Sequence, residues 1–416
     1  ELAAEGNSLY PRLHAIWGLG QVGRSGVKVV DTLVSFLNDS ETEVRANAVR
    51  VLGDLRAPEG KAPLLACLSS DESLRVRSLA AISLGRIAAS GDTEVIDALF
   101  SAAAKNGEST PDIVLRHALL SGLEQVASVD PAVARVNSAS REERLLAVLL
   151  LRSTESPELS KFLNDKDPLI FREVVRAIYD TKALDSEAGE LLSNLGKQTA
   201  TLPEAIQRRV VAANYRLGTG PHATRMLQLA SDSAVSLPVR KAALNGLKQW
   251  EKAIETDPVL GHYRPQSGEK DRSFATLSAA IGDSLRKFLT EPHDSELIAL
   301  GIELATSAGI RLDPETLIAQ VKNTKLSPEL RVAVLESLSE SKPAEFKSIV
   351  SELLSDKQTL LRAAAMKESF ALNLDGISEK AKDALAKDKL EVARAALDGL
   401  AAQDIETIVS LWKNRE

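Results

Sequence analysis

Residues 39–55 read DSETEVRANAVRVLGDL, and residues 71–87 repeat their plan as DESLRVRSLAAISLGRI. In both segments an Asp is followed six residues later by an Arg, and a Leu-Gly pair stands seven and eight residues after that Arg. The same Arg-to-Leu-Gly spacing begins at Arg12, so Arg12, Arg45 and Arg77 are 33 and 32 residues apart. A fixed period of this length is typical of repeat proteins, so one architecture is expected to extend along the chain.

The period returns at the C-terminal end. Degenerate copies read VRKAALNGL at 239–247, LSPELRVAVLESL at 326–338 and VARAALDGL at 392–400. The six-residue Asp/Arg spacing occurs in four pairs: Asp39 and Arg45, Asp71 and Arg77, Asp356 and Arg362, and Asp388 and Arg394. We therefore expect residues 1–416 to form a single body of stacked repeats.

Each period holds two segments with helical spacing of apolar residues, for example VVDTLVSFL at 29–37 and VRANAVRVLGDL at 44–55. The Asp falls just before the second segment, where a carboxylate can accept from free backbone N–H groups. The Arg lies about one and a half turns into that helix, within reach of a carboxylate of its own or the adjoining unit. This spacing predicts a ladder of Asp/Arg bonds along one edge of the stack.

The Asp-x5-Arg turn followed by Ala, Leu and Gly resembles the HEAT repeat. The resemblance implies an all-α fold, a right-handed α-solenoid of stacked antiparallel helix pairs, and a function in protein interaction. In such a stack no unit buries its own core, and stability is a sum over neighbouring contacts.

One stretch breaks the period: residues 251–274 contain Pro258, Pro265 and two glycines among charged residues, and they predict a long inserted loop. The loop places His262, Tyr263 and Arg264 together in a chain with only 4% aromatic residues. Two interpretations remain open. Tyr263 pins the loop onto the solenoid, or the loop contacts a partner or a neighbouring domain.

Composition excludes several function classes. The net charge of −7, from 51 basic and 58 acidic residues, provides no bulk field for nucleic acid or an anionic membrane. RRVVAANYR at 208–216 is the best local basic cluster, and a solvated helix face is its favoured interpretation. The single Cys67 excludes an internal disulfide and is expected in the core. No apolar run reaches the roughly 18 residues that span a bilayer, and no signal-peptide pattern precedes residue 20.

Cofactor and metal sites are not expected. Gly18, Gly20 and Gly23 match the G-x-G-x-x-G spacing, but a dinucleotide loop follows a strand and opens a helix, whereas these glycines end a repeat helix. The five histidines are scattered without H-x3-H or Cys partners, and His14 and His117 are expected to be buried and hydrogen-bonded.

A second resemblance concerns RLHAIWGLGQ at 12–21 and DPVLGHYRPQ at 257–266. They are similar to the HEAT-repeat portion of large exported dehydrogenase-like proteins of planctomycete-type bacteria. In that family a sugar-dehydrogenase-like β-propeller precedes the repeats and a c-type cytochrome follows them. This chain has no C-x-x-C-H, so the resemblance implies a non-catalytic scaffold, periplasmic or extracellular, that contacts other domains or proteins.

Two alternatives stay open: a HEAT-like nucleic-acid enzyme of DNA-glycosylase type that uses Arg208 and Arg209, and a free-standing cytosolic adaptor. Because the sequence begins at Glu1 rather than Met, it is interpreted as a processed form or a segment of something longer.

Overall fold

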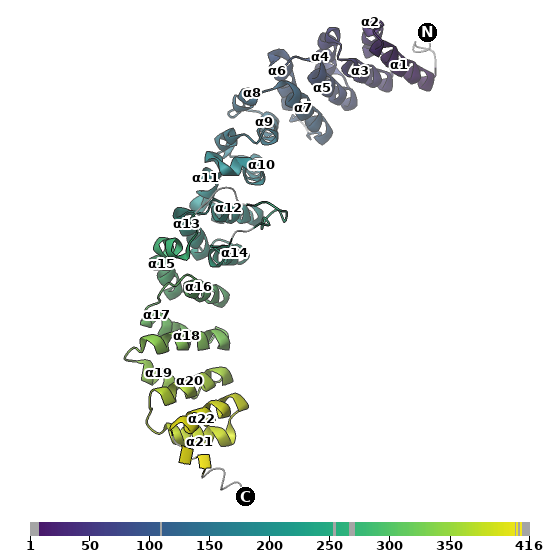
Figure 1. Cartoon of the computed structure of the whole chain (residues 1–416). Helices are drawn as coiled ribbons and strands as arrows, with labels where there is room; N and C mark the ends of the chain where they lie inside the picture. The colour runs from purple at the N-terminus through teal and green to yellow at the C-terminus, as the bar shows by residue number, and fades with distance from the viewer. Residues whose placement is uncertain are drawn as a thin grey trace. The chain divides into compact units, whose positions relative to one another are not determined.

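A computed structural model describes residues 8–108, 110–252, 255–265, 271–403, 405–406 and 408–409. The chain forms two compact units, residues 1–195 and 196–416 (Figure 1). Over the described ranges the structure is helical and contains no strand beyond an isolated antiparallel bridge between Thr256 and Tyr263. The all-α prediction is confirmed. One continuous body over 1–416, and the right hand of its superhelix, stay predictions.

The first unit consists of helix pairs in which each second helix packs on the next second helix. α2 packs against α3, α4 against α5, α6 against α7 and α8 against α9, while α1, α3, α5 and α7 pack in turn (Figure 1). The helices are α1 (Leu9–Arg24), α2 (Val30–Ser35), α3 (Thr42–Leu55), α4 (Lys61–Ser70), α5 (Leu74–Ile87), α6 (Thr93–Asn106), α7 (Ile113–Val126), α8 (Val129–Val133), α9 (Arg141–Ser153), α10 (Pro168–Asp180) and α11 (Glu187–Ser193).

The second unit has the same plan. α13 packs against α14, and each later odd-numbered helix packs against its successor; α12, α14 and α16 form one row of second helices and α18, α20 and α22 another. The helices are α12 (Glu204–Leu217), α13 (Gly220–Ser231), α14 (Leu237–Lys248), α15 (Phe274–Thr290), α16 (Ser295–Ser307), α17 (Pro314–Lys322), α18 (Pro328–Ser341), α19 (Phe346–Leu353), α20 (Thr359–Ala371), α21 (Ile377–Lys387) and α22 (Leu390–Gln403).

The helical segments around α9 and α10 are short, in a part of the chain where the repeat is degenerate in sequence. α8 has 5 residues, α11 has 7, and a 3₁₀ segment at Pro157–Phe162 precedes α10. The second helices α9 and α10 keep 13 residues each, because their apolar periodicity is intact.

The repeat glycine is explained by helix packing. A Cβ on Gly85 of α5 would lie 2.7 Å from the Cα of Gly122 in α7, so the two backbones touch. A Cβ on Gly20 would meet Val51 at 3.0 Å, whereas one on Gly18 meets nothing within 4 Å. Gly20 and Gly85 therefore lie where second helices pack closely on one another, and not in a phosphate-binding loop.

This contrast predicts opposite effects for two Gly→Ala substitutions. Gly85→Ala forces α5 and α7 apart and is expected to lower the free energy of unfolding by about 1–3 kcal/mol. Gly18→Ala, on an open helix surface, is expected to raise it by about 0.5–1 kcal/mol through helix propensity. Thermal unfolding followed by circular dichroism measures both. Equal effects would show that Gly85 is not a packing residue.

Candidate functional site

The turn before each regular second helix is built around an Asp that lies two residues before the helix N-cap. Asp39 Oδ1 accepts from the backbone N–H of Glu41 at 2.9 Å, and Asp71 Oδ1 accepts from that of Ser73 at 2.8 Å. Glu41 and Ser73 are the N-cap residues of α3 and α5 and make no side-chain cap bond. The Asp carboxylate therefore closes the turn that starts the helix.

The same carboxylate also accepts hydrogen bonds from an arginine of the preceding repeat. Arg45 donates to Asp71 from Nε at 2.9 Å and from Nη2 at 3.1 Å, and its Nη1 donates to the backbone oxygen of Asp39 at 2.9 Å. One guanidinium thus joins two consecutive turns, with both charged side chains nearly buried. Arg12 likewise pairs with Asp39, through Nη2 and Oδ2. We call this arrangement the arginine clamp; its carboxylate belongs to the following repeat.

The second unit contains the same clamp. Arg331 Nη2 donates to Asp356 at 2.8 Å, and Arg362 donates to Asp388 from Nη2 at 2.6 Å and to the backbone oxygen of Asp356 at 2.9 Å. The hydrogen bond from Arg362 lowers the pKa of the Asp388 carboxyl, and the bond to Asp71 raises the pKa of the Arg45 guanidinium. The Asp388 carboxylate is therefore held ionised as a structural acceptor.

Two of the predicted ladder residues do not join this set. No described carboxylate pairs with Arg77, and its Nε is buried without a hydrogen-bond partner. The residue two positions before the N-cap of α7, where Asp71 stands before α5, is Thr110, which has no carboxylate to accept a bond from Arg77. Arg394 lies in α22 and pairs with no residue of the described ranges. The predicted ladder is therefore interrupted at Arg77, and Arg394 stands at its last described position.

Sequence spacing missed two clamps in the first unit. Arg116 of α7 binds Glu142 in a bidentate pair at 2.7 and 3.0 Å, and Arg144 of α9 binds Asp165 at 2.8 Å. Glu142 lies inside a helix rather than in the turn, and no Arg stands six residues after Asp165, so the Asp-x5-Arg pattern could not find them.

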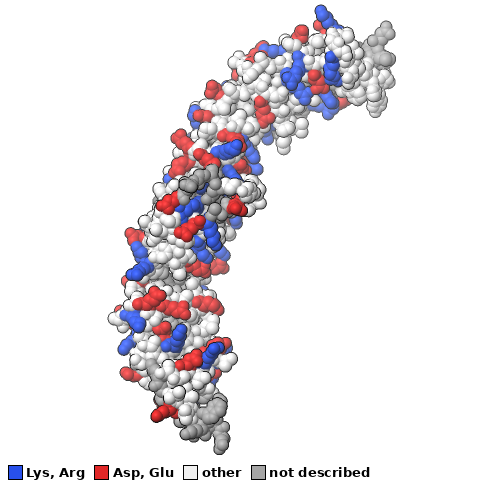
Figure 2. All heavy atoms as spheres, viewed as in Figure 1, with Lys and Arg blue, Asp and Glu red and all other residues white. Residues whose placement is uncertain are grey.

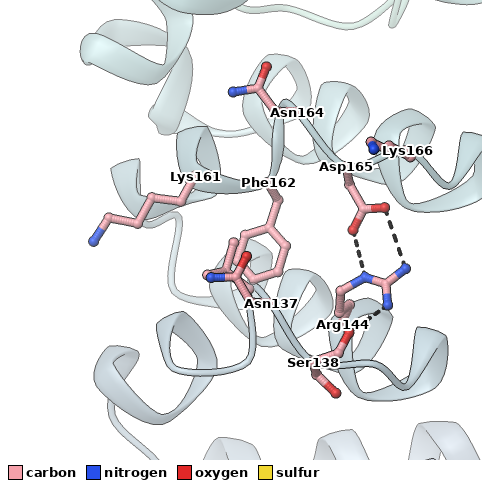
Figure 3. A pocket seen from close by; sticks show the side chains of 9 residues that line it. Asn137, Ser138, Arg144, Lys161, Phe162, Asn164, Asp165 and Lys166 are labelled. Atoms are coloured by element: carbon pink, nitrogen blue, oxygen red, sulfur yellow. Dashed lines mark hydrogen bonds and ion pairs between the residues drawn. The ribbon is translucent and has the colours of Figure 1, made fainter.

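A hollow of about 300 Å³ lies beside the Arg144 clamp (Figure 3). Figure 3 shows the Arg144 guanidinium engaged with Asp165 and Ser138, while Lys161 points away from it. The Arg144 guanidinium is thus engaged in structural bonds to both of these residues.

In the second unit a histidine replaces a clamp carboxylate. Arg240 Nη2 donates to Nδ1 of His293 at 3.0 Å, which requires a neutral imidazole, and the ring stacks on Phe288 with centroids 4.1 Å apart. Burial, and next the charge of Arg240, lower the pKa of His293, while Glu291 opposes the shift.

The inserted segment between α14 and α15, described at residues 249–252, 255–265 and 271–273, is held by a buried carboxylate. Asp257 is 0% exposed, and its Oδ1 accepts from the N–H groups of Val259 and Leu260 at 2.9 Å each. Its Oδ2 lies 3.3 Å from Arg264 and 3.7 Å from Arg216 of α12. Arg264 is therefore part of the anchor.

A second arginine ties the loop's end to the helices. Arg272 donates to the backbone oxygens of Trp250 and Tyr215 at 2.8 Å each, and its guanidinium lies over both rings at 4.4 and 4.3 Å. His262 and Tyr263 are exposed, Tyr263 by 70%. The interpretation in which Tyr263 pins the loop is therefore wrong, because charged side chains do so.

The remaining sequence candidates lie apart. His14 and His117 are exposed, so the expectation that they are buried is wrong; His117 lines a hollow between α5 and α7. Cys67 is buried, and desolvation raises its pKa to about 11. Gly18, Gly20 and Gly23 all lie within α1, and no strand precedes it in the described chain. Over the same residues no cluster of metal-binding side chains occurs, and no helix is long and apolar enough to cross a membrane.

The second helices of the first unit expose large apolar side chains. Ile113 is 72% and Val114 69% exposed at the start of α7. Val114 lines a hollow of about 370 Å³ together with Leu74, Leu79 and Ile82 of α5. In α1, Tyr10 and Trp17 are 76% and 45% exposed. Clustered exposed apolar side chains of this kind mark interaction surfaces.

A family description of HEAT repeats matches this chain twice, at residues 1–85 and 30–124. Residues 1–124 carry HEAT repeats. Phycocyanobilin lyase subunit alpha of Synechococcus elongatus is 38% identical over 85 residues, which cover 19% of this chain and 31% of that protein. The chain thus spans about a third of the length of this relative. The HEAT-repeat prediction is confirmed for residues 1–124, and the resemblance to exported dehydrogenase-like proteins stays a prediction.

Solved structures that are similar include the CpcE–CpcF complex of phycocyanin lyase from Nostoc sp., at 19% identity over 62% of this chain and 88% of that chain, with a TM-score of 0.28. The structure of Kap121p is similar at 14% identity over 95% of this chain and 51% of that chain, with a TM-score of 0.32.

Removing a clamp arginine is expected to cost far more than removing a surface ion pair. Arg331→Ala leaves the largely buried Asp356 without its guanidinium and is expected to lower the free energy of unfolding by about 3 kcal/mol. Lys322→Ala, which breaks the exposed pair with Glu352, is a matched control in the same unit and should cost less than about 1 kcal/mol. Urea unfolding followed by circular dichroism compares them. Similar costs would contradict a structural role for the clamp.

The hydrogen bond from Arg240 to neutral His293 leads us to expect that the protein is less stable in acid. Since its pKa in the folded chain lies below the ordinary value of 6.5, the unfolded chain binds the proton more readily. The contribution is complete above pH 6.5 and is lost as the pH falls through the folded-state value. Thermal midpoints between pH 7.5 and 5 should therefore fall more steeply for the natural chain than for His293→Gln, which keeps a neutral acceptor for Arg240. If the thermal midpoints of both proteins fall equally with pH, protonation of His293 is not the cause of the loss of stability.

Proposed function

We propose that this chain is a non-catalytic scaffold that binds a partner protein through the second helices of its repeats. The observation that carries the proposal is the exposure of Val114, which lines the hollow between α5 and α7, and of its chain neighbour Ile113. Covering one such side chain contributes roughly 1.5–3 kcal/mol, so a partner that covers both gains substantially. In the chain alone these two side chains stay exposed, and the free energy of burying them is gained only when a partner binds.

The chemistry of the carboxylates supports a structural function. Asp71, Asp356 and Asp388 are engaged by arginines of neighbouring repeats, and the pKa of Asp388 is lowered, whereas a general acid near neutral pH needs a raised value. The matched relative is itself named as a subunit, which is consistent with a function in association with other proteins.

A nucleic-acid function has less support. Acidic and basic side chains alternate over the visible face of each unit (Figure 2). Arg208 is paired with Glu204 at 2.7 Å, and Tyr215, the aromatic residue of the basic segment, is 3% exposed and cannot stack on a base.

The sequence motifs at 12–21 and 257–266 support a narrower form of the proposal, in which the scaffold belongs to an exported redox protein in the periplasm or outside the cell. The reading frame around the chain tests it. A signal peptide upstream and a C-x-x-C-H downstream are expected; a frame without either favours the cytosolic adaptor.

Site-specific photo-crosslinking tests the scaffold itself. A benzophenone side chain at His117, on the exposed surface of α7, is expected to give a discrete protein adduct in cells that make this chain. The same probe at Ser101, exposed on the first helix α6, is the control and should give none. Adducts of equal yield at both positions, or none at position 117, would contradict binding through the second helices.

A further inference from the structure

The interruption of the arginine clamp at Arg77 leaves a guanidinium without its acceptor. In the clamp at Arg45, the carboxylate of Asp71 accepts from both Nε and Nη2. The Nε atom of Arg77 is equally buried, but it has no hydrogen-bond partner. Arg75, two residues earlier on α5, pairs with Glu43 at 3.0 Å, so the missing carboxylate is particular to the clamp arginine of this helix.

The contacts between second helices show where the missing acceptor belongs. Between α1 and α3 and between α3 and α5, a Cβ added to the glycine eight residues after the clamp arginine would touch the residue twelve positions after the accepting Asp. These contacts join Gly20 to Val51 and Gly53 to Ser83. Between α5 and α7 the same contact joins Gly85, eight residues after Arg77, to Gly122, twelve residues after Thr110. Thr110 therefore occupies, relative to Arg77, the place of the accepting Asp.

The turn at Thr110 lacks only the charge of that Asp, because another residue closes it. In the preceding turn Asp71 accepts from the backbone N–H of the N-cap residue of α5. The N-cap residue of α7 is Asp112, whose backbone N–H donates to Oδ1 of buried Asn106 at 3.0 Å. Asn106 Nδ2 donates in return to the backbone oxygen of Asp112 at 3.0 Å. Asn106 thus closes the turn, and the Thr110 side chain is left exposed at the clamp position.

A phosphate on the Thr110 hydroxyl would supply the missing charge. It carries about −1.5 to −2 charges at pH 7 and three acceptor oxygens. It would also lie just before the first turn of α7, where the helix dipole favours an anion. A phosphate reaches further from the backbone than an Asp carboxylate, but the pair of Arg116 and Glu142 shows that a longer acid can also bind a clamp arginine. Pro111 follows, which disfavours helical backbone at Thr110 and so leaves this hydroxyl outside the helix.

We propose that Thr110 is a phosphorylation site, and that its phosphate binds Arg77 and completes the interrupted clamp between α5 and α7. A protein kinase supplies the phosphoryl group from a nucleoside triphosphate. Oγ of Thr110 forms a bond to the γ-phosphorus, and the bond from that phosphorus to the bridging oxygen breaks. The nucleoside diphosphate leaves, and the hydroxyl proton passes to a base of the kinase. This inference goes beyond the proposed scaffold function and does not depend on it.

The full chain with phosphothreonine installed at position 110 tests the contact with Arg77. Phosphorus NMR is expected to show the second pKa of the phosphate, ordinarily about 6, lowered by at least about half a pH unit. The thermal midpoint is expected to rise by about 2–4 °C over that of the unmodified chain. Arg77→Gln should remove most of both effects. Arg75→Gln, which changes a paired arginine of the same helix, is the matched control and should leave both in place.

A second variant tests the clamp position without phosphate. Thr110→Asp places a carboxylate where Asp71 stands in the preceding turn, and it is expected to raise the thermal midpoint by about 2–4 °C. Combined with Arg77→Gln, the same substitution should give no rise. This pair of variants keeps the test valid if the chain with phosphothreonine does not fold, as circular dichroism would reveal.

Mass spectrometry of the chain isolated from the cells that naturally make it tests the modification itself. A phosphate on Thr110 is expected, and phosphatase treatment should remove it together with the rise in thermal midpoint. Absence of phosphate from Thr110 would overturn the modification site. A phosphate pKa and a thermal midpoint that do not change with Arg77→Gln would overturn the completed clamp. The adduct at position 117 tests the scaffold separately from either result.

Discussion

The arginine clamp is the interaction on which the rest of the structure depends. No single helix pair of a solenoid buries its own core, so each pair needs a neighbour in a defined register. Hydrophobic contact between Ala- and Leu-rich helices is non-directional and tolerates sliding. A buried guanidinium that bonds one turn through Nη1 and the next turn's carboxylate through Nε is directional. A slipped register would leave Arg45 and Asp71 buried and unpaired, at a cost that hydrophobic contact could not offset.

The contact between consecutive turns recurs along the chain, but the side chains that form it differ in chemical type. Glu142 replaces the turn Asp from within a helix, and His293 replaces it with a neutral ring. Gln207 of α12 makes a fully neutral version, donating to the backbone oxygen of Leu202 and accepting from the N–H of Ser236. Each of these side chains joins a turn to the following repeat. The repeat therefore continues structurally through residues where its sequence signature has faded.

Sequence alone predicted the helix pairs and the edge on which the Asp and Arg residues lie, because both follow from spacing along one chain. It could not assign the arginine's partner, since Asp39 and Asp71 are both within reach of Arg45 and only the stacking distance decides. It also could not show that Thr110 leaves Arg77 without a carboxylate, because that position matters only once α7 is placed against α5.

The surface was harder to predict for a related reason. Periodicity identifies the apolar side of a helix but not whether a neighbour covers it, so exposure of Val114 and His117 appears only in the structure. In the inserted loop, the small number of aromatic residues in the chain suggested Tyr263 as the anchor. The buried carboxylate of Asp257 anchors the loop instead.

Where it is present, the buried arginine clamp fixes the register of one repeat against the next. A double-mutant cycle on Arg45→Ala and Asp71→Asn, with the free energy of unfolding measured in urea, tests it most directly. A coupling energy of about 1.5–3 kcal/mol is predicted for the pair. A coupling below about 0.5 kcal/mol, the size found for exposed helix pairs, would show that the stack is held by apolar contact alone and would contradict the account.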